Sequence, residues 1–199
     1  MRIPIGGMIA SGKTTLINKL SEELPDYKVL SEYRKNDELF DTLLRETYEG
    51  NTDAGLLLQI YFIQKHYKSQ KENAEEENLI MDRHLIEHWL FSHNRLSDPI
   101  IWQAYNTIFQ NFMMDSPQID MYIILDVTWE DFEKRIYARG RPAEIENFEK
   151  NKGYFNDLLN TYTKKLKAQC MIYNIPYAVI RTEDKTAEEV FELAMELIS

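Results

Sequence analysis

Short apolar segments alternate along the chain with longer segments in which apolar residues recur at helical spacing. Five short segments are rich in aliphatic or β-branched residues and predict strands: Arg2 to Gly6, Tyr27 to Ser31, Asn78 to Met81, Ile119 to Leu125 and Pro176 to Ile180. The intervening segments predict helices near residues 13–23, 36–48, 53–73, 84–94, 98–114, 128–139, 148–171 and 186–198. This alternation is typical of an α/β fold in which crossover helices connect parallel strands.

Length and composition narrow the class of protein. The 199 residues are close to the size of one ordinary domain, and 44% of them are hydrophobic. Twelve tyrosines and nine phenylalanines add aromatic material for a core, which excludes disorder as the main state. We therefore expect residues 1–199 to form a single folded domain.

Net charge, apolar runs and cysteine content indicate which partners the protein binds and in which compartment it lies. The chain carries 23 basic and 33 acidic residues, a formal net charge of −10, so it would on average repel a nucleic-acid backbone. No apolar run approaches the roughly 18–20 residues that cross a bilayer, and the start of the chain lacks the layout of a signal peptide. The single cysteine, Cys170, fits a reducing compartment. We expect a cytoplasmic protein that binds no membrane and no nucleic-acid polymer.

The segment after the first predicted strand carries the most specific motif. Residues 7–14 read GMIASGKT, a full match to GxxxxGK[ST] between a strand and a helix. Three of the seven glycines gather here, at positions 6, 7 and 12. Glycines let the backbone curl so that its N–H groups face an anion, and the start of the next helix adds its positive dipole end.

This motif predicts a binding site for a nucleoside triphosphate (NTP). Lys13 is expected to reach the β- and γ-phosphates, and the Thr14 hydroxyl is expected to bind Mg²⁺. The expected NTP-binding residues of this segment are Gly7, Met8, Ile9, Ala10, Ser11, Gly12, Lys13, Thr14 and Thr15. A glycine-rich turn that binds nothing is the alternative interpretation.

A second phosphate-binding element is predicted at residues 135–141, which read RIYARGR. On a helix Arg135 and Arg139 share a face, and Gly140 then ends the helix and turns Arg141 toward the same point. Three guanidinium groups without local acidic partners would repel one another unless an anion, such as a transferring phosphoryl group, joins them. A solvated basic helix end is the alternative. We expect an arginine-rich lid at about residues 135–147.

Acidic residues follow two other predicted strands, at the edge where open parallel sheets bind ligands. Glu32 comes after the second strand and Asp82 after the third. A carboxylate at either position could act as a general base or hold Mg²⁺. Each carboxylate could instead cap the helix that follows.

Together these motifs resemble the deoxyribonucleoside kinases, a P-loop family, over nearly the whole chain. The resemblance is carried by the phosphate loop, Glu32 in place of a Glu-Pro pair, Tyr48, Gln59, Asp82-Arg83-His84 in place of Asp/Glu-Arg-Ser/Thr, and a lid-like segment from Arg135 to Glu144. It implies a P-loop kinase fold with a five-stranded parallel sheet flanked by helices. It also implies Mg²⁺-dependent transfer of the γ-phosphate of ATP or another NTP to the 5′-hydroxyl of a deoxyribonucleoside, in nucleotide salvage.

The same resemblance assigns roles in phosphoryl transfer. Glu32 would take the proton of the 5′-hydroxyl, Arg83 would orient that hydroxyl, and Asp82 would help to hold Mg²⁺. The arginines of the lid would clamp the phosphates, with Arg139 and Arg141 on the NTP. The implied catalytic residues are Glu32, Arg83, Lys13, Arg135 and Arg139.

The resemblance also places the deoxynucleoside. Tyr48 and Glu144 would meet its 3′-hydroxyl, and Gln59 would hydrogen-bond its base. The helix around Gln59 is apolar on almost every side, so a buried amide there needs a partner, which could also be a neighbouring backbone group. The family is typically dimeric through helices equivalent to those near 53–73 and 98–114, and we expect a homodimer.

Several residues depart from the family pattern. Tyr33 replaces the proline after the glutamate, His84 the Ser/Thr of the Asp-Arg motif, and Ala143 the second acid of the lid. The base-reading arginine of the family falls on His66, and its acidic partner falls on His88. We predict that both histidines line the base pocket, although they could also be satisfied core or surface residues.

Three other functions compete with this interpretation. Residues 84–88 read HLIEH, a match to the H-x-x-E-H motif of zinc metalloproteases, but that activity leaves the phosphate loop without a role. A nucleoside monophosphate kinase would need an extra basic clamp, which Arg34, Lys35 and Arg45 could supply. A regulatory module that turns NTP over slowly is the third possibility.

Overall fold

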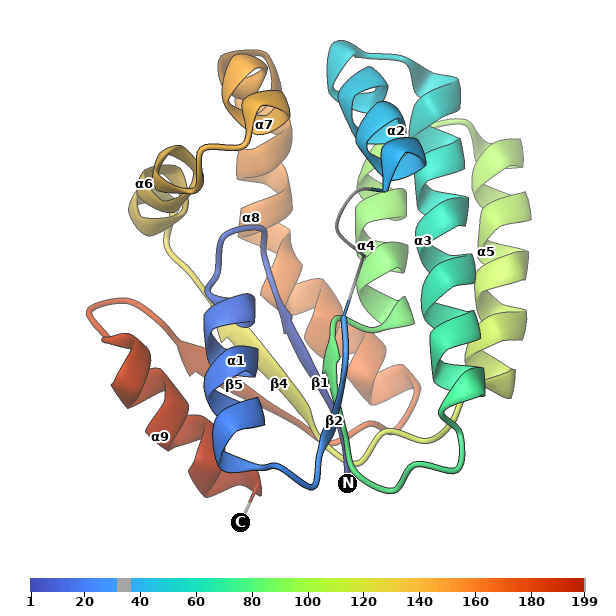
Figure 1. Ribbon diagram of the computed structural model, residues 1–199. Helices are drawn as coiled ribbons and strands as arrows, with labels where there is room; N and C mark the ends of the chain where they lie inside the picture. Colours follow the sequence, from blue (N-terminus) through green and yellow to red (C-terminus); the bar gives the residue numbers. More distant parts are fainter. Residues whose placement is uncertain (32–36, 199) are drawn as a thin grey trace.

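The computed structural model describes residues 1–31 and 37–198, and a five-stranded parallel sheet forms its centre (Figure 1). The strands are β1 (Arg2–Gly7), β2 (Lys28–Leu30), β3 (Leu79–Asp82), β4 (Tyr122–Asp126) and β5 (Tyr177–Arg181), in the order β2-β3-β1-β4-β5. Ile5 pairs with Asp82 on one side and with Ile123 on the other. The segments after β1 and β3 therefore emerge next to each other, at the edge where such sheets bind ligands.

Helices cover both faces of this sheet (Figure 1). They are α1 (Lys13–Glu23), α2 (Glu38–Glu49), α3 (Thr52–Glu72), α4 (Leu85–Arg95), α5 (Pro99–Asp115), α6 (Trp129–Arg139), α7 (Pro142–Glu146), α8 (Phe148–Ile172) and α9 (Ala187–Ile198). Alternate strand residues decide which helices lie on which face. Ile3 and Ile5 pack against α1 and α9, whereas Tyr122 and Ile124 pack against α4 and α8.

The α/β fold and its five parallel strands are confirmed, and the helices predicted from periodicity begin and end within about two residues of the observed ones. The strand predicted from Ile119 to Leu125 begins only at Tyr122. The short helix α7 was not predicted, because five residues are too few for a helical period to be recognised. Its start, with proline in the first turn after Gly140, follows the usual preference for proline there.

The helices place two walls around the ligand-binding edge of the sheet. Figure 1 shows α2, α3 and α5 grouped beyond α4 on one side, and α6 with α7 on the other. The loop between β1 and α1 rises between these walls. Within the described ranges, no helix combines the length and apolar character that crossing a membrane requires.

Candidate active site

The loop between β1 and α1 is folded tightly around its own backbone. Gly12 adopts a left-handed conformation (φ 100°) as the N-cap of α1, a conformation that L side chains disfavour. The Ser11 N–H donates to the Met8 carbonyl oxygen over 3.1 Å. The buried Lys13 ammonium donates to the carbonyl oxygens of Gly7 and Met8, at 3.0 and 3.1 Å. The ammonium is thereby held beside the N-terminal end of α1, where an anion is favoured.

Asp82 and Arg83 lie at the end of β3, beside this loop. Arg83 has a left-handed backbone (φ 74°), which is uncommon for a residue with a side chain and concentrates at functional sites. Its Nη1 donates to the Gly7 carbonyl oxygen over 3.0 Å and to the Glu87 carboxylate over 2.5 Å. The guanidinium also packs 4.9 Å from the centre of the Phe91 ring. Arg83 is thus a buried cation held in one orientation.

The three arginines of the predicted lid do have acidic neighbours, so the expectation that they lack local acidic partners is wrong. Arg135 lies 3.2 Å from the Asp131 carboxylate, one turn earlier on α6. Arg141 and Arg139 approach the same oxygen of Glu144, at 3.3 and 3.9 Å. The physical reason is local: Arg135 and Arg141 have their acids at i,i+4 and i,i+3 spacing, which share a face, and the turn at Gly140 brings Glu144 of the next helix back toward Arg139.

Arg135 also links the lid to the phosphate loop. Its Nη1 donates to the Ser11 carbonyl oxygen and to the Thr182 hydroxyl, both over 3.3 Å. Thr182 follows β5, and its hydroxyl donates to the Asp126 carbonyl oxygen. Arg135 therefore joins α6, the phosphate loop and the segment after β5.

One cavity of about 1150 Å³ brings most of the predicted residues together. Its wall includes the phosphate loop from Ile9 to Thr15, the strand-end pair Asp82 and Arg83, and residues from both helical walls. The predicted site residues that line it are Ile9, Ala10, Ser11, Gly12, Lys13, Thr14, Thr15, Tyr48, Gln59, Asp82, Arg83, His88, Arg135, Arg139, Arg141 and Glu144.

Four predicted residues are placed differently. Gly7 and Met8 lie behind the wall: the Met8 side chain is in the core, and the Gly7 N–H points to Glu87 and Tyr162. His66 lies behind His88 and borders a smaller cavity of about 500 Å³. Glu32 falls outside the described residues, although Ser31, directly before it, lines the main cavity.

The end of the cavity away from the phosphate loop is largely apolar, with a few polar groups. The buried Gln59 is fixed by Ser92, whose hydroxyl lies 3.1 Å from the Gln59 Oε1. His88 is only 1% exposed, and neither ring nitrogen has a hydrogen-bond partner among the described residues. Its ring stacks on Phe62, with centroids 4.8 Å apart and planes at 11°. Burial, with the nearby His66, lowers the pKa of His88 well below its usual value, so the imidazole is neutral.

Tyr48 and Glu144 form a polar pair on the opposite side of this end. Both side chains are buried, and burial together with the Glu144 carboxylate raises the pKa of the Tyr48 hydroxyl. The hydroxyl therefore stays protonated in the electrostatic field of Glu144, whose Oε2 has no hydrogen-bond partner among the described residues. A donor and an acceptor set side by side suit an alcohol group of a ligand.

The H-x-x-E-H motif is used differently from a metal site. The His84 Nδ1 accepts the Ile86 N–H as the N-cap of α4, and burial lowers the pKa of His84 to about 3. Both carboxylate oxygens of Glu87 accept hydrogen bonds, from Arg83 and from the Tyr122 hydroxyl, while His88 faces the cavity. Nowhere in residues 1–31 and 37–198 do three His, Cys, Asp or Glu side chains cluster as metal ligands would. The geometry therefore does not support a metalloprotease.

Sequence reasoning missed several residues of the cavity wall. Thr182, Lys185 and Thr186 come from the segment after β5 and lie beside the phosphate loop. Applying the strand-end rule to the fifth strand, as to the first four, would have identified them. Arg95 was missed as well: its guanidinium donates to the Thr47 carbonyl oxygen over 3.1 Å and lies 4.6 Å from the Tyr154 ring centre. Its position seven residues after His88, on the same face of α4, was the available signal.

Comparison with known proteins identifies a family. A family model described as deoxynucleoside kinase matches residues 3–199. The chain is 36% identical over 185 residues to an uncharacterized protein of Mycoplasma genitalium, covering 89% of this chain and 81% of that protein. It is 26% identical over 173 residues to a deoxyguanosine kinase of Lactobacillus johnsonii, covering 80% and 74%. The deoxyadenosine kinase of M. mycoides, solved with the products dCMP and a flexible dCDP, superposes with a TM-score of 0.83 at 25% identity, covering 100% of this chain and 98% of that one.

Proposed function

The chain belongs to the deoxynucleoside kinase family and phosphorylates a deoxynucleoside with an NTP, and we propose how its residues move the γ-phosphate of ATP or another NTP to the 5′-hydroxyl. The observation that carries this proposal is the single cavity, which joins the phosphate loop to the pocket around Gln59 and His88. At about 1150 Å³ it exceeds the roughly 300–1,000 Å³ typical of a site for one ligand. The donor and the acceptor can therefore be held together.

The donor phosphates lie against the phosphate loop. The backbone N–H groups at the start of α1 and the Lys13 ammonium neutralise their charge. Arg139 and Arg141, which line the same cavity, clamp the phosphates, and Arg135 holds the lid against the loop through Ser11. These fixed positive charges stabilise the charge that develops on the transferring group. Residues 135–147 thus act as the lid of a single domain that spans residues 1–199.

Kinases of this family use an NTP together with a divalent metal ion, and the residues present suit Mg²⁺. Thr14, in the phosphate loop, and Asp82, at the end of β3, line the same cavity. Both are hard oxygen donors, the kind that Mg²⁺ prefers, and Mg²⁺ usually takes only one or two protein ligands beside phosphate oxygens. When bound, the ion offsets charge on the β- and γ-phosphates.

The acceptor hydroxyl is placed by Arg83 and activated by Glu32. Arg83 lies between the phosphate loop and the acceptor end of the cavity, with its guanidinium already oriented. Glu32 accepts the proton of the 5′-hydroxyl as the oxygen attacks the γ-phosphorus and the bond to the donor's leaving oxygen breaks. The role of Glu32 rests on the family resemblance and on its position directly after Ser31, since it lies outside the described residues.

The deoxynucleoside occupies the end of the cavity formed by α2, α3, α4 and α7. Its 3′-hydroxyl donates to Glu144 and accepts from the Tyr48 hydroxyl. Its base lies against Phe62 and meets the Gln59 amide and the neutral His88, which offers one N–H and one lone pair. His66 supports the His88 ring from behind, with centroids 4.5 Å apart.

A homodimer through α3 and α5 fits the surface of these helices. Large apolar side chains are exposed there, notably Leu57 on α3 and Ile100, Ile101, Ile108 and Met114 on α5. Exposed apolar side chains gathered on adjacent helices are typical of a surface that is covered in the assembled protein. The family resemblance assigns the dimer contact to the same two helices.

The acceptor distinguishes this proposal from a nucleoside monophosphate kinase. Of the residues that could hold an acceptor phosphate, Arg34 and Lys35 lie outside the described residues, and Arg45 is exposed and does not line the cavity. The wall opposite the phosphate loop is largely apolar, and its charged groups are the Glu144 carboxylate and the Arg95 guanidinium. Arg95 already donates to the Thr47 carbonyl oxygen and packs on Tyr154, and a carboxylate repels a phosphate, so this composition favours an uncharged acceptor.

The experiment is a transfer assay with γ-labelled ATP and each of the four deoxynucleosides and their monophosphates. We expect label on at least one deoxynucleoside and none on the monophosphates. Label only on monophosphates would overturn the proposed acceptor. NTP hydrolysis at the same slow rate with and without any deoxynucleoside would favour a regulatory module. Titrating Mg²⁺ against a chelator in the same assay tests the metal requirement.

A further inference from the structure

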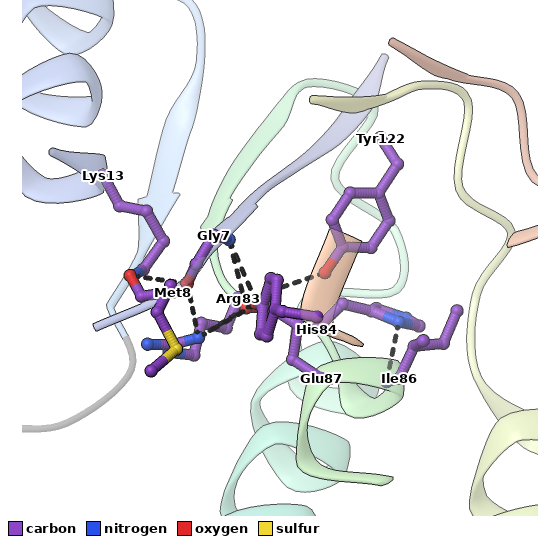
Figure 2. A network of polar contacts seen from close by, with 9 residues as sticks. Gly7, Met8, Lys13, Arg83, His84, Ile86, Glu87 and Tyr122 are labelled. Carbon is purple, nitrogen blue, oxygen red and sulfur yellow. Dashed lines mark hydrogen bonds and ion pairs between the residues drawn. The ribbon is translucent and has the colours of Figure 1, made fainter. Parts of the chain in front are cut away.

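A buried carboxylate lies beneath the active site and receives hydrogen bonds from four directions. Glu87 is 0% exposed and does not line the cavity. Its oxygens accept from Arg83 Nη1 at 2.5 Å, from the Tyr122 hydroxyl at 2.6 Å, from the Gly7 N–H at 3.3 Å and from the Tyr162 hydroxyl. Figure 2 shows Glu87 between Gly7, Arg83 and Tyr122.

The donors come from four different elements of the fold. Gly7 ends β1, Arg83 follows β3, Tyr122 begins β4, and Tyr162 lies on α8. Burial and the Glu87 carboxylate raise the pKa of both tyrosine hydroxyls well above their usual value, so both remain protonated donors. A single side chain thus fixes the relative positions of three strand ends and one helix.

The sequence makes room for this carboxylate with a glycine that the phosphate-loop motif does not require. A Cβ at Gly6 would lie 2.5 Å from Tyr122 Cε1 and 3.0 Å from Glu87 Oε1. Real Cβ atoms do not approach carbon atoms so closely. Gly6 is therefore explained by the packing of Glu87 and Tyr122 against β1, and not by phosphate binding.

Two hydrogen bonds connect Glu87 to the donor site and to the acceptor site. On the donor side, Glu87 and the Tyr162 hydroxyl hold the N–H of Gly7, and the Gly7 carbonyl oxygen accepts from Lys13. On the acceptor side, Glu87 holds the guanidinium of Arg83, which also donates to the Gly7 carbonyl oxygen. A buried ion pair is often no more stable than apolar residues of the same volume, so the burial of this pair is weak evidence for a role in fold stability.

We propose that Glu87 is a positioning residue that fixes Arg83 relative to the phosphate loop. It acts through Arg83 and Gly7 and contacts neither substrate. Its contribution is geometric, because phosphoryl transfer requires the attacking oxygen and the γ-phosphate to be held in line. This inference rests on the proposed function, which places the 5′-hydroxyl at Arg83 and the phosphates at the loop.

The test is a graded series of variants assayed for kcat and for the KM of each substrate. Glu87→Gln replaces one acceptor oxygen by an amide donor, so at least one of the four bonds is lost; we expect kcat to fall about 10- to 100-fold. Tyr162→Phe removes the hydroxyl that contacts both Glu87 and Gly7, and a smaller fall is expected. Tyr122→Phe removes one contact on the side away from Arg83 and should have the least effect. Both KM values should change by less than about threefold throughout.

Two controls separate positioning from support of the fold. Ile86→Val creates a small defect in the buried face of α4 without touching the network, so it should lower Tm and leave kcat unchanged. In an Arg83→Lys background, Glu87→Gln should cost much less kcat than in the natural chain, because it acts through Arg83. If Glu87→Gln does not fold, Tyr162→Phe carries the test.

Each result decides between the alternatives. Folded Glu87→Gln and Tyr162→Phe variants with normal kcat and lowered Tm would show that Glu87 only supports the fold. Fully additive losses in the double variant would show that it does not act through Arg83. Absence of kinase activity in the natural chain would instead reject the proposed function. That outcome is distinct from a failure of the Glu87 proposal, which shows itself only as a difference between the natural chain and its variants.

Discussion

The two ends of the cavity are built in different ways. The centre of the phosphate end is local in sequence. Residues 7–15 alone supply the loop, the start of α1 and the ammonium of Lys13. The nucleoside end takes Tyr48 from α2, Gln59 from α3, His88 from α4 and Glu144 from α7. The loop that holds the donor phosphates is therefore encoded in one short segment, to which the lid adds its arginines, whereas the choice of acceptor depends on how four helices pack.

The two ends also differ in charge. The phosphate end gathers Lys13, Arg135, Arg139 and Arg141, as binding of a polyanion requires. At the nucleoside end Tyr48 is kept neutral by a raised pKa and His88 by a lowered one. Neutral, preorganised polar groups of this kind discriminate ligands by hydrogen-bond pattern and shape, since a mismatched polar group is left unpaired.

The largest effect is expected at the proposed general base. Glu32→Gln should preserve the fold and NTP affinity but lower kcat by about 10²–10⁴, because only proton acceptance from the 5′-hydroxyl is lost. Steady-state kinetics with saturating substrates, together with NTP binding in the absence of acceptor, measure both quantities. Glu38→Gln, an exposed acid at the start of α2, is the matched control. An undiminished kcat would remove Glu32 from the mechanism.

At the phosphate end, Lys13→Ala should weaken NTP binding and turnover together, with kcat lower by about 10²–10³. The ammonium neutralises phosphate charge in both the ground state and the transition state, so KM and kcat should both change. Lys19→Ala removes an ammonium from the same helix, one that pairs with Glu188 away from the cavity, and should have little effect. Wild-type activity of Lys13→Ala would contradict the role of the phosphate loop.

The local character of the phosphate end explains why it could be predicted from the sequence. A GxxxxGK[ST] match between a strand and a helix fixes the fold of its own eight residues, and alternation of short apolar segments with helical ones sufficed for the parallel sheet. Asp82 and Arg83 follow from the same rule, because residues after parallel strands meet at one edge.

The nucleoside end could be predicted only through the family resemblance, and less completely. Which face of α3 is turned to the cavity depends on long-range packing, so the sequence could not show that Gln59 lines the wall while His66 lies behind it. The pairing of Arg139 and Arg141 with Glu144 was missed because it depends on α7, a helix of five residues. Arg95 was missed because its one signal, a position two helical turns after His88, has meaning only once His88 is known to face the cavity.

The two histidines offer a way to change the nucleoside end alone. Replacing His66 by Arg and His88 by Asp restores the charged pair of the family and should change the ranking of deoxynucleosides by kcat/KM about tenfold or more. The KM for NTP should stay nearly constant, because the phosphate end is untouched. His88→Asp alone should produce most of the change, since only His88 lines the cavity.

A control variant and the pH dependence of the substrate ranking test whether His88 itself reads the base. His93→Asp changes an exposed histidine on the same helix and should leave the ranking unchanged. Because the pKa of His88 is lowered well below its usual value, His88 should stay neutral from pH 8 to pH 6, and the natural ranking should be the same at both. A folded double variant with the natural ranking would place these histidines outside base recognition.

The smallest effect is expected at the lid, which connects the two ends. Arg139 and Arg141 share Glu144, so donor phosphates must compete with that carboxylate for the same guanidinium groups. Gly140, with φ 71° and an exposed position, allows the segment to move. Binding of an NTP should therefore hold Arg139 and Arg141 over the cavity and slow tryptic cleavage of the Arg139–Gly140 bond by a few-fold. Cleavage after Lys68, exposed on α3 and outside the main cavity, serves as the internal reference. Equal rates of cleavage after Arg139 with and without NTP would show that the lid does not respond to the donor. The phosphate end and the nucleoside end would then be coupled through the phosphate loop and Arg83, without the lid.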